Sequence, residues 1–320
     1  MIDFRYHLVS LISVFLALAV GIILGAGPLQ GAIGETLTEQ VDALRAERTE
    51  LRTELDATQG ALDGDERYIE AVGTQLVTGS LQGNRVAVVL LGEVPEDVHD
   101  GVLNQLDSAG ANVVSQSVLT EAWTDSAEES SRETVADGLR AGLGAAAPEG
   151  DDPSATLGAA LALALTGSEG GDGGAVRSSQ ATDLEAQLER FGFVEPGDDD
   201  QTEPAQALVL LVGSAGQPQE TADGTTEETE PTPDVWTAVT RAAQQVSGAA
   251  VLAGPTDEPG DTVQAVRDDE EIAAEVSTVS GVDRIVGRIN VPLAVAARLE
   301  GVVGQYGLED DATGVLPPVG

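Results

Sequence analysis

Two histidines, His7 and His99, are the only imidazoles in this sequence, and the chain contains neither cysteine nor lysine. The absence of cysteine excludes thiol nucleophiles, disulfides and zinc ribbons, and the absence of lysine excludes a Walker A phosphate loop. A Ser-His-Asp triad would have to use His99, but the sequence has no Gly-x-Ser-x-Gly elbow, and His99 falls within an expected amphipathic helix. We therefore predict that His99 is an exposed helix residue, that the chain has no catalytic residues, and that the protein is not an enzyme.

Metal and phosphate sites have no clear signal either. Cu(I) prefers thiolate and thioether ligands and Cu(II) prefers imidazole, whereas the sequence offers only Met1 and two distant histidines. Gly213-Ser214-Ala215-Gly216 follows an expected strand but lacks the rest of a phosphate loop, so we predict a turn and no cofactor site there. Three acidic clusters lack calcium-loop spacing and are predicted to be solvated loops and helix starts: Glu149/Asp151/Asp152, Asp198–Asp200 and Asp268–Glu271.

The net charge of the chain is −40, from 55 acidic residues and 15 arginines. Such a surface repels the phosphates of nucleic acids. We therefore exclude nucleic acid as a partner.

An apolar run over residues 8–29 is long enough to cross a membrane, because about 20 apolar residues of helix span the hydrocarbon core. Arg5 and His7 precede the run, whereas acidic residues follow it before the next arginine, Arg45. The positive-inside rule then places residues 1–7 in the cytoplasm and the rest of the chain outside the cell. The alternative is a cleaved signal peptide, but the run is long for one, and Pro28 is a poor residue after a cleavage point.

Small residues recur every four positions in this run, at Ala17, Gly21 and Gly25. The Gly-x-x-x-Gly spacing lets two helices in a membrane approach closely, which predicts a dimer contact. Small residues are also common in membrane helices without any such role, so both interpretations stay open.

The segment over residues 30–80 is predicted to be a coiled-coil stalk, because apolar residues recur at alternating spacings of four and three. The predicted interface residues are Leu37, Val41, Leu44, Leu51, Leu55 and Leu62. With Leu37 at position d, Glu47 of one chain would face Arg52 of a parallel partner, whereas an antiparallel pair would bring like charges together. A parallel homodimer is the prediction, and packing of this helix on its own domain is the alternative.

Two features weaken the second half of the stalk. Arg48, Thr58 and Asp65 are polar residues at core positions. The glycines at 60, 64 and 73 each cost about 1 kcal/mol relative to alanine in a helix.

Residues 85–320 are predicted to form an extracytoplasmic α/β domain, a Rossmann-like fold with a parallel sheet, because uniformly apolar runs of strand length alternate with amphipathic stretches. The expected strands are residues 86–91, 112–119, 207–212, 249–253 and 277–282. The expected helices are residues 95–109, 130–143, 154–166, 181–191 and 234–246, a short stretch from Asp261, and residues 291–306 entered through Asn290. Acidic segments 195–206 and 214–234 are predicted to be solvated loops.

The N-terminal residues Met1-Ile2-Asp3-Phe4-Arg5-Tyr6-His7-Leu8-Val9-Ser10-Leu11, continued by residues 14–22, closely resemble the start of the actinobacterial MctB family, whose members are named as copper transporters. The order of anchor, coiled segment, α/β region and C-terminal helix ending near Gly304-Gln305-Tyr306-Gly307 is also similar to that family over nearly the full length. The resemblance implies a role in copper homeostasis, proposed as export across the mycobacterial envelope.

Corynebacterial relatives, the SteB-like division proteins, look like coiled-coil scaffolds that control a peptidoglycan hydrolase with a partner. The residues favour this second role, because a conduit through an outer membrane needs many alternating strands and one helix encloses no pore. The sequence therefore predicts a membrane-anchored envelope protein with a lipid bilayer and an envelope or division protein as partners. A degenerate α/β enzyme, with a ligand near Gly92 or Gly213, is the third alternative.

Overall fold

The computed structural model describes residues 4–26, 28–169, 176–196, 203–213, 232–255 and 261–318. The chain divides into two compact units, Met1–Asp65 and Glu66–Gly320. The boundary between them lies inside a helix.

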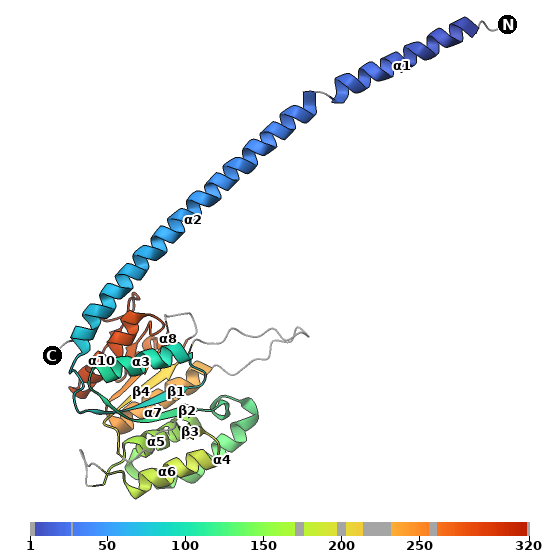
Figure 1. The fold of residues 1–320 in the computed structure, drawn as a ribbon. Coiled ribbons are helices and arrows are strands. Elements are labelled where there is room, and N and C mark those ends of the chain that lie inside the picture. Colours follow the sequence, from blue (N-terminus) through green and yellow to red (C-terminus); the bar gives the residue numbers. More distant parts are fainter. Residues whose placement is uncertain are drawn as a thin grey trace. The chain divides into compact units, whose positions relative to one another are not determined.

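The first unit is helical (Figure 1). Helix α1 (Phe4–Ala26) covers most of the predicted span, but it begins earlier and ends earlier than residues 8–29. Pro28 and Leu29 belong to the next helix, α2 (Pro28–Val77). Proline is favoured in the first turn of a helix, where its missing N–H costs nothing.

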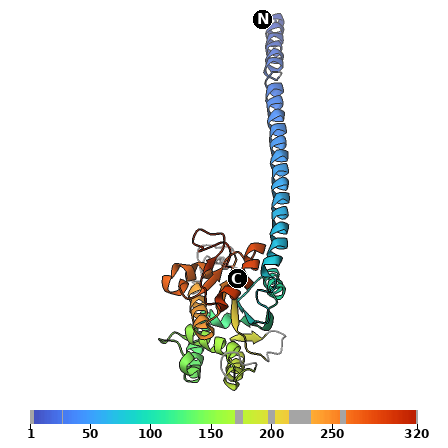
Figure 2. The ribbon, with the colours of Figure 1, turned by 90° about the vertical axis from the view of Figure 1, so that its left-hand side faces the viewer.

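Helix α2 contains 50 residues and continues through the boundary into the second unit. At 1.5 Å per residue it is about 75 Å long, and Figure 2 shows it as one uninterrupted helix. Gly60, Gly64 and Gly73 therefore do not break it. A helix is confirmed over residues 30–77 of the predicted coiled-coil segment 30–80, whereas pairing with a partner stays a prediction.

The second unit is built around a seven-stranded sheet in the order β3-β2-β1-β4-β5-β6-β7. All neighbouring strands are parallel except β3, which runs antiparallel to β2. The strand order reverses between β1 and β4, which is the topological switch point of a doubly wound sheet. The strands are β1 (Arg85–Leu91), β2 (Asn112–Leu119), β3 (Val194–Pro196), β4 (Ala207–Val212), β5 (Ala250–Ala253), β6 (Ser277–Val279) and β7 (Gln305–Tyr306).

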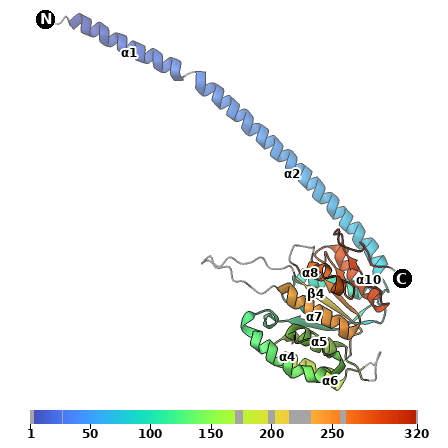
Figure 3. The same cartoon turned by 180° about the vertical axis from the view of Figure 1, so that it is seen from behind.

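The helices lie on both faces of this sheet (Figures 1 and 3). One core cluster joins one sheet face to the end of α2, to α3 (Glu96–Ser108) and to α10 (Ile285–Leu299). The other cluster joins the opposite face to α4 (Glu129–Leu143), α5 (Pro153–Thr166), α6 (Ser179–Arg190), α7 (Thr232–Ser247), α8 (Thr262–Asp268) and α9 (Glu270–Ala273). The predicted α/β class with a mostly parallel sheet is confirmed.

The predicted final helix over residues 291–306 is confirmed over residues 291–299, but both of its predicted ends are wrong. Helix α10 runs from Ile285 to Leu299, Asn290 is buried inside it, and Tyr306 lies in strand β7. Asn290 followed two residues later by Pro292 imitates a helix start, but the Asn290 side-chain amide instead donates a hydrogen bond to the carbonyl of Val315 (2.7 Å).

Three smaller expectations also change. Strand β6 ends at Val279, three residues before the predicted end. The predicted acidic loop 195–206 starts inside strand β3, and its residues 197–202 lie outside the described chain. In the predicted loop 214–234, helix α7 already begins at Thr232, and residues 214–231 lie outside the described chain.

Candidate functional site

Helix α1 is a candidate membrane span. The segment Arg5–Gly25 is the one helix of the described chain that is long and apolar enough to cross a bilayer, and none of its side chains is buried by the protein itself. The Ser13 hydroxyl donates a hydrogen bond to the carbonyl of Val9 (2.8 Å), so this polar group is satisfied within the helix, as a lipid environment requires.

The small residues of α1 lie on one face of the helix, since Ala17, Gly21 and Gly25 are spaced by four. A Cβ atom built at Gly21 or Gly25 would meet no atom within 4 Å. None of the described residues therefore covers that face at Gly21 or Gly25, and its role as a dimer contact stays a prediction.

An apolar stripe runs along α2, which we define as Val41, Leu44, Leu51, Leu55 and Leu62. Val41 exposes 38% of its surface and the four leucines expose 56–63%. The stripe follows the predicted heptad positions, whereas the side chain of Leu37 lies outside the described residues. Soluble surfaces rarely expose contiguous apolar side chains without a partner, so the stripe is a candidate interaction surface.

The carboxyl ends of β1 and β4 form the second candidate, because ligands of doubly wound sheets bind at the switch point. Here Gly213 lies so close to the backbone carbonyl of Glu93 that a Cβ atom could not fit, and the Trp236 ring is 3.8 Å from the Cβ position of Gly92. Helix α3 then begins with Glu96 and Asp97 and has no side-chain cap. Carboxylates at this helix start would repel a phosphate, so the described residues provide no nucleotide cradle.

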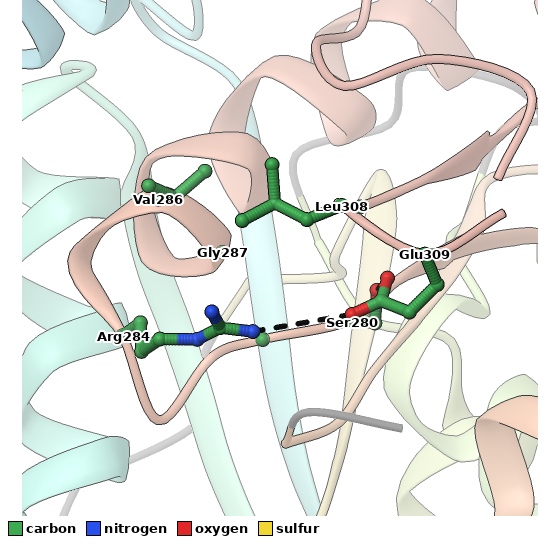
Figure 4. Close-up of a pocket in the computed structure, with 8 residues that line it drawn as sticks. Ser280, Arg284, Val286, Gly287, Leu308 and Glu309 are labelled. Carbon is green, nitrogen blue, oxygen red and sulfur yellow. Dashed lines mark hydrogen bonds and ion pairs between the residues drawn. The ribbon is translucent and has the colours of Figure 1, made fainter.

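A small pocket lies where β6 and β7 end and α10 begins (Figure 4). Its lining residues are Ser280, Gly281, Arg284, Val286, Gly287, Gly307, Leu308 and Glu309. It encloses room for about one water molecule. Figure 4 shows the Arg284 side chain reaching toward the Glu309 carboxylate, and the ion pair between them spans 4.0 Å.

Arg267 contacts Ser280 and Glu309, two of the residues that line this pocket, and its side chain is 2% exposed. The guanidinium donates hydrogen bonds to the hydroxyls of Thr278 (3.0 Å) and Ser280 (3.1 Å) and to the carbonyl of Tyr306 (3.1 Å). It also pairs with the carboxylates of Asp311 (3.3 Å) and Glu309 (3.7 Å). One buried cation thus ties α8, β6 and the chain after β7 together.

The Glu309 carboxylate accepts a hydrogen bond from the Ser280 hydroxyl. Burial alone would raise the pKa of Glu309, but this hydrogen bond, a backbone hydrogen bond and the charges of Arg267 and Arg284 together hold the pKa below its ordinary value. A carboxylate with a lowered pKa is a poor general base at neutral pH. Glu309 is therefore poorly suited to activate Ser280 as a nucleophile, and the arrangement fits a structural joint better than a catalytic pair.

The described residues contain no group of three or more His, Cys, Asp or Glu side chains that could hold a metal ion. His7 lies in α1 and His99 in α3. His99 is half-buried and its Nε2 atom is buried, so the expectation of an exposed residue is wrong, although its place in a helix is confirmed. Helix α3 packs against α10 and the sheet, which explains the partial burial. The predicted helix starts are confirmed at Asp152 and Asp269, whose carboxylates cap α5 and α9.

Comparison with known proteins identifies the family. The model of the family described as "Copper transport outer membrane protein, MctB" matches residues 1–317. The chain belongs to this family. Proteins named Copper transporter MctB from Mycobacterium bovis and Mycobacterium tuberculosis are each 28% identical to it, covering 98% of this chain and 99% of the relative. The protein of the same name from Mycobacterium leprae is 26% identical over 99% of this chain.

Membership of the MctB family confirms the resemblance seen in the N-terminal residues. The family name contains copper transport, which raises the question of whether the described side chains could bind copper. The described residues do not fit a copper site of soft ligands, since the sequence has no cysteine and its one methionine is Met1. The described residues therefore provide no thiolate or thioether ligand for Cu(I).

Sequence reasoning missed the joint around Arg267 and Glu309. The Arg267–Asp311 pair joins residues 44 positions apart, and no local pattern marks such a contact. A weak signal was available, since Arg267 follows the apolar residues Val263 and Val266 in a short helix whose face is buried.

Proposed function

We propose that this protein acts in copper homeostasis at the cell envelope as a membrane-anchored, non-enzymatic member of the MctB family. Helix α1 is the anchor, residues 1–7 lie in the cytoplasm, and the α/β domain lies outside the cell. Arg5 and His7 before the span, and Glu39 and Asp42 after it, support this orientation. Family membership supports the copper role.

The observation that carries the proposal is the exposed apolar helix α1 at the start of a chain that matches this family over residues 1–317. A single helix encloses no pore, and the described residues hold no group of three or more His, Cys, Asp or Glu side chains that could bind a metal ion. We therefore propose that the protein supports copper export by organising other envelope components, rather than by forming a conduit.

A deletion strain grown under graded copper tests the role. We expect reduced copper tolerance that the full chain restores. A complementing variant with three aspartates in α1, at Val14, Leu18 and Ile22, should fail to restore tolerance and should leave the membrane fraction, because each charge in the bilayer costs about 3 kcal/mol. Unchanged copper tolerance of the deletion strain would overturn the copper role.

The topology is tested separately in intact cells. A protease added outside should degrade the α/β domain, whereas a tag placed before Phe4 should stay protected. Protection of both ends, or recovery of the full-length protein in the soluble fraction, would contradict the anchored orientation.

A second candidate function is an envelope scaffold that regulates a peptidoglycan hydrolase during cell division. The exposed stripe on α2 favours it, because such a surface suits protein partners and not a metal. Septation defects in the deletion strain with normal copper tolerance would select this function. Copper sensitivity with normal septation would reject it.

A further inference from the structure

We propose that residues 41–62 of α2 form a parallel coiled-coil seam with a second copy of this chain. The seam stops at Asp65, because the rest of the helix packs against its own α/β domain. The inference is independent of the copper role. It assigns the stripe one partner and sets the length of the contact.

The upper part of α2 has what a seam requires. Its stripe side chains lie at heptad positions and remain exposed in the single chain. At the intervening core position 58, the Thr58 hydroxyl donates a hydrogen bond to the carbonyl of Glu54 (2.9 Å), so this polar group can be buried against a partner without losing its bond. Arg48 occupies an a position and puts one charge per chain into the seam. A polar residue at a single a position lowers the stability of a coiled coil but fixes its register and pair number.

The lower part of α2 is already occupied by its own domain. Val77 is fully buried, Ile69 packs against the core that α2 shares with α3 and α10, and Gly73 touches Ile289 so closely that a Cβ atom would collide with it. Asp65, at the last core position before this change, would put a charge into a continued seam. The boundary between the two compact units falls at the same residue, so about three heptads remain for the partner.

The charges favour a parallel second copy over other occupants. In a parallel pair, Glu47 of each chain faces Arg52 of the other, and Gln40 faces Arg45. An antiparallel pair would set g positions against g positions and e positions against e positions, which brings the glutamates (Glu47 and Glu54) together and the arginines (Arg45 and Arg52) together. Two copies anchored through α1 in one membrane also have their α2 helices starting from the same side.

Cysteine crosslinking of the full chain in its own membrane tests the seam, because the wild-type chain contains no cysteine. Thr58→Cys places a thiol at a core position, where a parallel pair brings the two copies together. Thr53→Cys places it on the opposite helix face as the matched control. With a short bismaleimide, we expect at least about tenfold more dimer from Thr58→Cys. Equal yields from both variants, or no dimer from either, would overturn the proposal.

Aspartate pairs test the energetics in the Thr58→Cys background. Leu44→Asp with Leu51→Asp puts two charges into the seam and should lower the crosslinked dimer about tenfold or more. Ala46→Asp with Thr53→Asp adds the same charges at the same seven-residue spacing on the outer face and should leave the dimer unchanged. Equal effects of the two pairs would contradict the seam.

Charge reversal supplies a variant that leaves the apolar stripe intact. Glu47→Arg should reduce crosslinking by bringing two arginines together across the seam, and adding Arg52→Glu should restore it. Failure of the second change to restore the dimer would refute the parallel register. Copper tolerance is measured in none of these assays, so their outcome is separate from that of the proposed function.

Discussion

Replacement of Arg267 by methionine should strongly destabilise the α/β domain. Methionine retains much of the apolar stem, so the loss is mainly polar. The Tyr306 carbonyl loses a 3.1 Å donor and the Asp311 and Glu309 carboxylates lose their buried cation. Breaking a buried ion pair by removing one partner costs about 3–5 kcal/mol. We expect the lower end, about 3 kcal/mol, because Asp311 is 35% exposed and Glu309 keeps Ser280 and Arg284.

The measurement is urea unfolding of the detergent-solubilised chain followed by tryptophan fluorescence. Both tryptophans of the chain, Trp123 and Trp236, are buried in the core cluster that packs α4 to α9 against one face of the sheet, with their rings 6.1 Å apart. Their fluorescence therefore reports unfolding of the core that holds the domain together. Arg284→Met is the control, because this arginine is 42% exposed and its pair with Glu309 spans 4.0 Å, which predicts a cost of about 0–1 kcal/mol. Equal free energies of unfolding for the two variants would refute the role assigned to Arg267.

Further predictions concern packing, pH and a buried hydrogen bond. Gly287→Ala should destabilise the domain by about 3 kcal/mol, because its Cβ would collide with the backbone of Gly281. Gly138→Ala has no atom within 4 Å of its Cβ position and should stabilise α4 by about 0.5–1 kcal/mol. Equal urea midpoints for the two variants would contradict this prediction. The folded-state pKa of Glu309 is lowered from 4.5, so the ionised carboxylate stabilises the fold above that pH, and this stabilisation is lost as the pH falls through the folded-state pKa. In urea titrations, the free energy of unfolding should therefore differ less between about pH 7 and pH 3 for Glu309→Gln than for the wild type. Trp123→Phe removes the Nε1 hydrogen bond to the carbonyl of Phe193 (2.7 Å) and should lower the free energy of unfolding by about 1–2 kcal/mol. The loss stays this small because the same carbonyl still accepts a hydrogen bond from the amide of Thr120. An unchanged free energy of unfolding would refute this.

The strands that the sequence predicted well are those buried on both faces. The runs 86–91 and 207–212 are uniformly apolar, and the structure places both in the centre of the sheet. Strands β3 and β7 escaped prediction because two or three residues such as Gln305 and Tyr306 carry no period. Their strand character comes from the neighbour they pair with, which local sequence does not encode.

The candidate sites likewise divide into those that local sequence encodes and those that only the fold creates. The α1 span and the α2 stripe depend on residues close in the sequence, so spacing alone located them. The contacts of Arg267 and the closure of the switch point by Glu93 and Trp236 depend on residues brought together by the fold. Asn290 illustrates why local sequence can mislead. Asparagine is a residue type favoured at helix starts, but here its side chain donates a hydrogen bond to the carbonyl of Val315, which is 25 positions away in the sequence.

Both margins of the sheet offer an incoming strand very little backbone. At one margin the three residues of β3 run antiparallel and end in Pro196, and at the other the two residues of β7 are followed by a bridge between Tyr306 and Gly314. Short, proline-marked edges discourage strand addition and the fibrous growth that follows from it. The sheet edges therefore offer little backbone for self-association, which agrees with our proposal that two copies pair through the stripe on α2.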